Sequence, residues 1–89
     1  MNIIENRVKQ IIELISSEYD MTCNITYNKI DYVDDYYIIY YDIECGGFSK
    51  SSTVILVDSD ISNLQYLYND FNDIMRDFII SCYKVIKDE

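Results

Sequence analysis

From Met21 to Tyr32 the chain alternates apolar and polar side chains with a period of two, which is the pattern of β-strands that bury one face. The apolar positions shift from odd to even numbers near Asn28–Lys29. One extra residue in the strand explains this shift, so we expect a β-bulge there. A turn at the same point is the alternative, although it leaves the second strand unusually long.

The first strand is expected to start near Met21, with Asp34–Asp35 as the turn into a second strand from Tyr36 to Cys45. When the residues that flank this turn are paired, apolar residues face each other along both strands. The expected pairs are Val33 with Tyr36, Tyr32 with Tyr37, Ile30 with Ile39, Ile25 with Ile43 and Cys23 with Cys45.

A helix is expected before these strands, from about Ile3 to Ser17, with Asn2 as its N-cap. After them, a hairpin loop over residues 46–51 leads to a third strand from Ser52 to Val57. The apolar stripe of the helix is Ile4, Val8, Ile11, Ile12 and Ile15.

A second helix is expected from about Ile61 to Lys87, capped by Asp58-Ser59-Asp60. At 1.5 Å per residue it is roughly 40 Å long, more than a three-stranded sheet covers. The expected fold is therefore a single α+β domain over residues 1–89, ordered α-β-β-β-α, with two helices on one face of a three-stranded antiparallel sheet. The stripe of the second helix is Leu64, Leu67, Phe71, Ile74, Met75, Phe78, Cys82 and Val85.

Acidic residues outnumber basic ones by 16 to 7, and the imbalance is concentrated in one part of the chain. Residues 30–75 hold nine acids and a single base, Lys50. Concentrated negative charge keeps a protein soluble and also steers it toward basic partners, so both readings are open. The same charge disfavours direct nucleic-acid binding.

Two common signs of catalysis are missing from the sequence. The chain has no histidine, the commonest general base near neutral pH, and no glycine-rich phosphate-binding motif. Its acids lack the spacing of a calcium loop. We therefore expect a non-enzyme without metal or cofactor. The three cysteines, Cys23, Cys45 and Cys82, form no CxxC pair, which favours free thiols in the cytoplasm, and no segment resembles a signal peptide or a membrane span.

Three aspartates of the second expected helix form a row. Asp70, Asp73 and Asp77 follow a spacing of three and four residues, which places them along one helix face. Aspartate is a mediocre helix former, so solubility alone would be served better by glutamate. A row of carboxylates at this spacing is comparable to phosphates along a nucleic-acid strand. A plain solvated face, partly neutralised by Arg76, is the alternative.

A second candidate surface is aromatic. If the odd positions of the second strand face the helices, Tyr36, Ile38 and Tyr40 lie on the open face of the sheet. Tyrosine buries a large area at low entropic cost, so such a face is a candidate interface for a partner or a second copy. Tyrosine packing between strands is the alternative. The neighbouring acids are Asp31, Asp34 and Asp35.

The order α-β-β-β-α over residues 3–87 resembles that of double-stranded-RNA-binding domains. Those domains use lysines at the start of their second helix, where this chain has Asp58-Ser59-Asp60. The resemblance therefore implies a shared topology without RNA binding.

The acidic block of residues 30–75 and the row Asp70, Asp73 and Asp77 resemble small phage-encoded inhibitors that mimic nucleic acid, anti-CRISPR proteins among them. This resemblance is one of class and assigns no roles to individual residues. It implies an inhibitor that occupies a basic nucleic-acid groove on a host nuclease or CRISPR effector, with exposed tyrosines as its non-polar anchor. An immunity or antitoxin protein against a basic toxin, or a homodimeric regulatory module, is the alternative.

Overall fold

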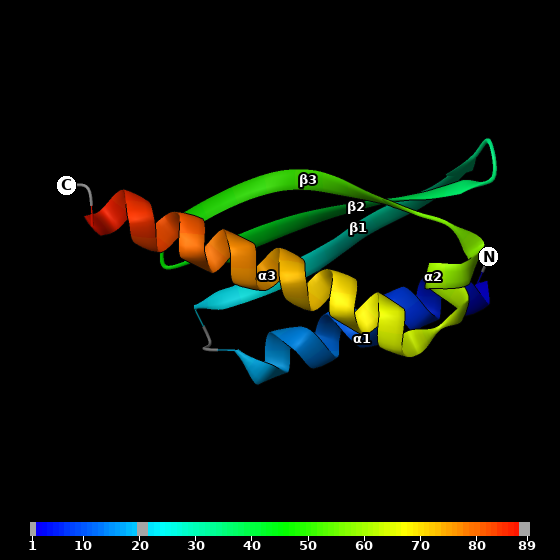
Figure 1. The fold of residues 1–89 in the computed structure, drawn as a ribbon, viewed down its shortest axis with the longest axis horizontal. Helices are drawn as coiled ribbons and strands as arrows, with labels where there is room; N and C mark the ends of the chain where they lie inside the picture. Colours follow the sequence, from blue (N-terminus) through cyan, green and yellow to red (C-terminus); the bar gives the residue numbers. More distant parts are fainter. Residues whose placement is uncertain (1, 20–21, 88–89) are drawn as a thin grey trace.

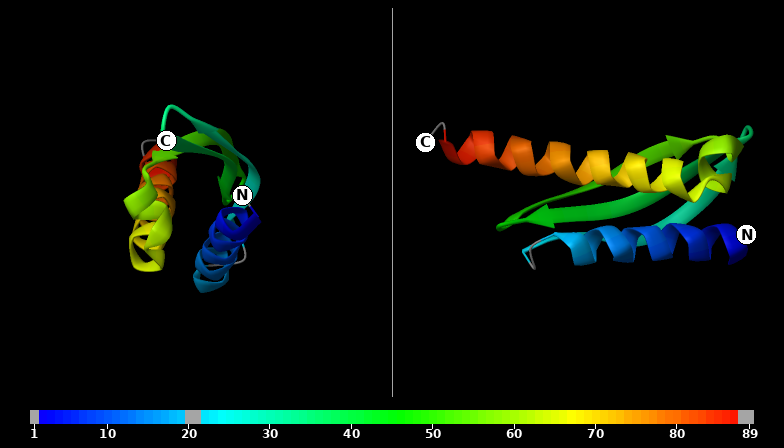
Figure 2. Two further views of the ribbon diagram at one scale, coloured as in Figure 1. Left: turned by 90° about the vertical axis from the view of Figure 1, so that its right-hand side faces the viewer. Right: turned by 60° about the horizontal axis from the view of Figure 1, so that its bottom comes forward.

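The computed structural model describes residues 2–19 and 22–87, with side chains placed for 3–19 and 22–84. One face of a three-stranded antiparallel sheet is covered by helices, and the opposite face is open (Figures 1 and 2). The elements follow the order α1 (Asn2–Glu18), β1 (Cys23–Val33), β2 (Tyr36–Cys45), β3 (Phe48–Leu56), α2 (Asp58–Ser62) and α3 (Leu64–Lys87). The expected α+β fold with a long C-terminal helix is confirmed.

The register between β1 and β2 agrees with the expected pairing at every predicted position. Val33 pairs with Tyr36 across the Asp34–Asp35 turn, and Cys23 pairs with Cys45 at the far end. The register shifts between Tyr27 and Lys29, which confirms the bulge and excludes a turn there. Met21, the expected start of β1, lies outside the described residues.

The second hairpin is tighter than expected. Its turn consists of Gly46 and Gly47 alone, both with positive φ (58° and 92°), and β3 therefore begins at Phe48 rather than Ser52. Two residues with positive φ match the right-handed twist of the flanking strands, and glycine adopts this conformation at no steric cost. The predicted six-residue loop was wrong because residues 48–51 carry no apolar alternation of their own.

The predicted second helix is broken in two at Asn63, which adopts an extended conformation (φ −109°, ψ 109°). The Asn63 side-chain oxygen accepts hydrogen bonds from the backbone amides of Gln65 (2.9 Å) and Tyr66 (3.3 Å), so this residue caps α3. The predicted cap was wrong, since Asp58 and Asp60 lie inside α2 and Val57 occupies its N-cap without a side-chain bond. The first-helix cap predicted at Asn2 falls on a side chain outside those described.

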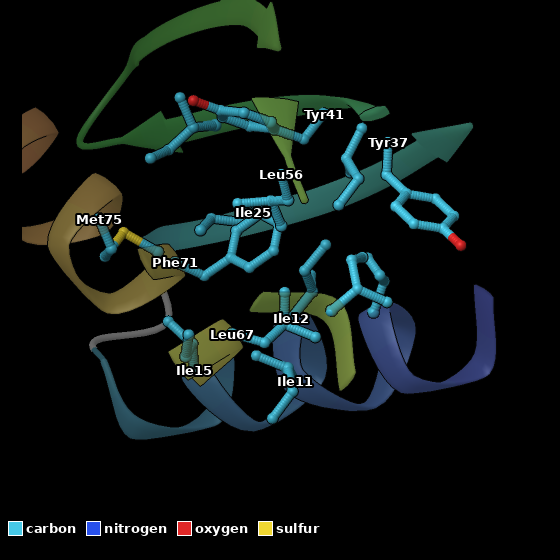
Figure 3. Close-up of a cluster of buried hydrophobic side chains, with 14 of the residues drawn as sticks. Ile11, Ile12, Ile15, Ile25, Tyr37, Tyr41, Leu56, Leu67, Phe71 and Met75 are labelled. Atoms are coloured by element: carbon cyan, nitrogen blue, oxygen red, sulfur yellow. The ribbon is translucent and has the colours of Figure 1, made fainter. Parts of the chain in front are cut away.

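The core lies between the helices and the inner face of the sheet (Figure 3). Phe71 and Met75 of α3 are fully buried against Ile12 and Ile15 of α1 and the strand residues above them. Most residues of the two predicted apolar helix stripes are buried. Leu64 is half exposed because it is the first residue of α3 after the break, and the Val85 side chain is outside the described part. On β2, the inward residues are Tyr37, Ile39, Tyr41 and Ile43, as expected.

Cys23 and Cys45 form a disulfide between the directly paired ends of β1 and β2, whereas Cys82 is a buried free thiol. The expectation of three free thiols was therefore wrong for two of them. Register brings the two cysteines face to face, and the absence of a CxxC spacing carries no information about such a pair. Among the described helices, none is long and apolar enough to span a membrane.

Candidate functional site

The predicted row of aspartates lies on one flank of α3, and we call Asp70, Asp73 and Asp77 the acidic flank. The opposite flank of α3 faces α1, because the Tyr19 hydroxyl donates to Asn72 and the Tyr68 hydroxyl donates to Glu18, both at 2.7 Å. The acidic flank is consequently turned away from α1. Asp77 shares a groove with Lys50 of β3, which shows that this flank borders the β3 side of the sheet.

The three carboxylates differ in their surroundings. Asp73 is exposed and forms an ion pair with Arg76 at 3.0 Å, so its charge is partly neutralised, as the sequence indicated. Asp77 is exposed and has no ion-pair or hydrogen-bond partner among the described residues. Asp70 is half buried, and burial together with the nearby carboxylates of Asp60 and Asp73 raises its pKa. Carboxylates that crowd in this way favour the approach of a cation.

The groove beside the acidic flank is mainly apolar. Its floor is formed by Tyr41 and Ile43 of β2, and its helix wall by Ile74 and Phe78 of α3. The Lys50 ammonium lies 5.9 Å from the centre of the Phe78 ring. A partner that reaches the acidic flank therefore also meets an apolar surface.

A second apolar surface lies on the open side of the sheet, and we call Val33, Tyr36, Ile38 and Ile55 the outer-face patch. Ile38 pairs directly with Ile55, and Val33 with Tyr36, so the four side chains are neighbours across three strands. Ile55 is 61% exposed and Tyr36 48%. The expectation that Tyr36, Ile38 and Tyr40 point away from the helices agrees with the alternating burial along β2.

The remaining predicted residues lie around this patch. Lys29 is 3.6 Å from the Asp31 carboxylate and its ammonium is 4.6 Å from the centre of the Tyr40 ring, so both predicted residues are already engaged. Asp34 and Asp35 form the exposed tip of the β1–β2 hairpin, with φ of 51° and 67°. Aspartate is among the few residues that tolerate this conformation, so these two acids have a structural role in the turn.

The structure divides the predicted site into two surfaces. The acidic flank lies on the helical side of the sheet, whereas Asp31, Tyr36 and Tyr40 lie on the open side. Sequence periodicity places residues on one face of one element, and it carries no information on how faces of different elements combine.

Asp60 is an acid of this site that the sequence reasoning assigned only to a helix cap. It lies close enough to Asp70 to contribute to the raised pKa of that carboxyl, so it extends the acidic flank toward α2. The position of Asp60 depends on the helix break at Asn63, which brings α2 back toward α3. The apolar pattern of the sequence runs through Asn63 without interruption, so the sequence contains no signal for this contact. Within the described residues, no group of three or more histidine, cysteine or acidic side chains is placed to hold a metal ion.

Comparison of the chain with family models, with curated proteins and with solved structures gives no match. The resemblance to double-stranded-RNA-binding domains is therefore one of element order.

Proposed function

We propose that this protein is an inhibitor of the nucleic-acid-mimic type, of the class that includes phage-encoded anti-CRISPR proteins, and that it occupies a basic nucleic-acid-binding groove of a host nuclease or effector. The observation that carries the proposal is the acidic flank, where Asp70, Asp73 and Asp77 form a solvent-accessible row beside an apolar groove. Two of the three carboxylates lack a cationic partner among the described residues. A basic partner would supply those cations.

The energetics favour a partner that removes water from the flank. A charge-assisted hydrogen bond between a carboxylate and an arginine contributes about 1.5–3 kcal/mol when it is partly desolvated. The same contact contributes less than about 1 kcal/mol when it stays exposed. The apolar groove formed by Tyr41, Ile74 and Phe78 supports the desolvated case, because a partner seated on it excludes water from the neighbouring Asp77.

The proposal includes a non-catalytic role and action in the host cytoplasm. The Cys23–Cys45 disulfide weighs against a reducing compartment, since cytoplasmic disulfides are rare. Cys82, by contrast, is a free thiol. The state of the two paired cysteines in the purified protein is therefore a direct test of this part of the proposal.

We assign the outer-face patch to self-association. It lies on the opposite side of the sheet from the acidic flank, so a dimer formed through it leaves the flank free for a basic partner. Tyrosine and isoleucine are suited to this, because they bury a large area around a polar rim.

The experiment that tests the function compares the parent protein with the triple variant Asp70→Asn, Asp73→Asn, Asp77→Asn as immobilised bait for host lysate. Asparagine keeps the size of the side chain and removes its charge. The expected result is a partner that is retained at low salt, eluted by added double-stranded DNA or RNA, and absent from the variant. Retention by both baits, or a stable complex of partner, protein and nucleic acid, would contradict mimicry.

A further inference from the structure

The two edges of the sheet are protected to very different degrees. On the outer side of β1, the Ser16 hydroxyl of α1 accepts a hydrogen bond from the Ile25 amide (3.0 Å) and donates one to the Ile25 carbonyl (3.3 Å). The bulge between Tyr27 and Lys29 follows, and the charged pair Lys29–Asp31 lies beyond it. Bulges, charges and covering side chains are the devices that prevent a further strand from adding to an edge.

Among the described residues, the edge of β3 has no bulge and no covering side-chain hydrogen bond to its backbone, and Lys50 is its single charge. β3 pairs with β2 over nine residues without a register shift, contains no proline, and is the only helix or strand of the fold without an acidic residue. In a hairpin with a two-residue turn, the pair that flanks the turn exchanges both hydrogen bonds, and such pairs then alternate along the strands. The residues that direct their amide and carbonyl groups away from β2 are therefore Ser49, Ser51, Thr53 and Ile55.

The acidic flank determines what this edge attracts. Helix α3 runs alongside the strands (Figure 1). Asp77 in its C-terminal half lines a groove together with Lys50 of β3. A strand added to β3 would point every second side chain to the helical side of the sheet, at a repeat of about 6.6 Å. The step from Asp73 to Asp77 along a helix is about 6 Å, so alternate basic side chains match this spacing.

We propose that the free edge of β3 accepts an extended basic segment of a partner protein as a fourth strand, with basic side chains at alternate positions that reach the acidic flank. This inference deepens the proposed function and rests on it, because it specifies which part of a basic partner is bound. Backbone hydrogen bonds to Ser51 and Thr53 supply affinity, and the carboxylates of α3 select the charge.

A second copy of the chain is a poorer occupant of this edge. Two β3 strands paired about a two-fold axis would place both acidic flanks on the same side of the joined sheet. Each copy carries a net charge of −9, and β3 contributes only Lys50 to offset it. Charge complementarity therefore favours a basic segment.

The test uses a labelled peptide of alternating arginine and threonine, with its ends blocked, and measures binding by fluorescence anisotropy at low salt. Two further peptides carry N-methyl groups on the arginine amides or on the threonine amides. Only one set of alternate amides faces β3, so one methylated peptide should lose at least about tenfold in affinity while the other binds like the parent peptide. Equal binding of both would overturn strand addition, and the basic-partner function would stand.

Protein variants test the same contact from the other side. Thr53→Pro removes an amide that points to solvent, which an edge strand tolerates, and it should abolish binding, whereas Thr53→Val should not. The triple asparagine variant of the acidic flank should also lose about tenfold or more. Full peptide binding by that variant would contradict the charge selection and the proposed function together. A dimer that Thr53→Pro dissociates, with no peptide binding, would show a second copy at this edge and overturn the inference.

Discussion

Ser16 on α1 and Ile25 on β1 are joined by two hydrogen bonds through one hydroxyl group. The Ser16 oxygen accepts from the Ile25 amide at 3.0 Å and donates to the Ile25 carbonyl at 3.3 Å. A helix side chain thus takes the place of a neighbouring strand at this point of the edge. It also fixes α1 against the sheet next to the buried Ile25 and Ile15.

Ser16→Ala should destabilise the protein by about 1–3 kcal/mol, because it leaves a part-buried amide and carbonyl without their partner. The free energy of unfolding in urea measures the change. Ser17→Ala is the matched control, since the Ser17 hydroxyl is exposed and donates to the Leu14 carbonyl within the same helix. Equal unfolding free energies for Ser16→Ala and the parent would contradict the edge-covering role.

Local sequence pattern was sufficient for the register of β1 and β2. Each predicted pair, including the shift after Tyr27, follows from aligning apolar residues on one face, and a slip by one residue would expose Ile39 and Ile43. The break at Asn63 could not be predicted in this way. Ile61, Leu64 and Leu67 continue the helical spacing, and the break depends on how α2 packs against α1 and α3.

For the candidate site, periodicity placed Asp70, Asp73 and Asp77 correctly on one helix face. It did not show that this face borders β3, because that depends on contacts from Tyr19 to Asn72 and from Glu18 to Tyr68 across the helix pair. The difference in protection between the β1 and β3 edges likewise depends on a contact between elements, that of Ser16 with Ile25. In the sequence, Ser16 indicates only the end of a helix.

Asp70→Asn should stabilise the protein at neutral pH. Burial and the carboxylates of Asp60 and Asp73 raise the pKa of Asp70 in the folded state, so the folded protein holds this proton more tightly than the unfolded chain. The ionised Asp70 carboxylate therefore destabilises the folded protein at pH values above its folded-state pKa. This destabilisation disappears as the pH falls below 3.8, the ordinary pKa of an aspartate. The gain stays below about 1 kcal/mol because the carboxyl is partly hydrated.

Thermal melts from neutral to acid pH measure this difference between Asp70→Asn and the parent. Asp77→Asn removes the same charge from an exposed position of the acidic flank, so it controls for the change in net charge. A melting-temperature gain for Asp70→Asn that persists at the lowest pH, or a larger gain for Asp77→Asn, would refute the assigned cause.

Ile38→Asp should lower the self-association of the protein with little loss of stability, since Ile38 is half buried on the outer face in the middle of the patch. Multi-angle light scattering measures the mass at high micromolar concentration. Gln10→Asp on the exposed side of α1 is the control for added charge. A parent mass of 10.6 kDa, that of one chain, would show that the patch does not bind a second copy.

The Cys23–Cys45 disulfide predicts how many thiols react before and after reduction. Alkylation of the unfolded protein without reductant should modify Cys82 alone, and all three cysteines should react after reduction. Because the bond joins residues 22 apart in sequence, reduction should lower the free energy of unfolding by about 2–4 kcal/mol. Three reactive thiols without reductant would instead favour a protein kept reduced in the cytoplasm.

The salt dependence of binding tests the central claim most directly. Once a partner is isolated, calorimetric titration at increasing sodium chloride compares the parent with the variant Asp70→Asn, Asp73→Asn, Asp77→Asn. Mimicry predicts that the parent binds at least about tenfold more tightly at low salt, that the difference shrinks as salt screens the charges, and that nucleic acid competes with both. Equal affinities for parent and variant, or binding that nucleic acid leaves unchanged, would contradict it.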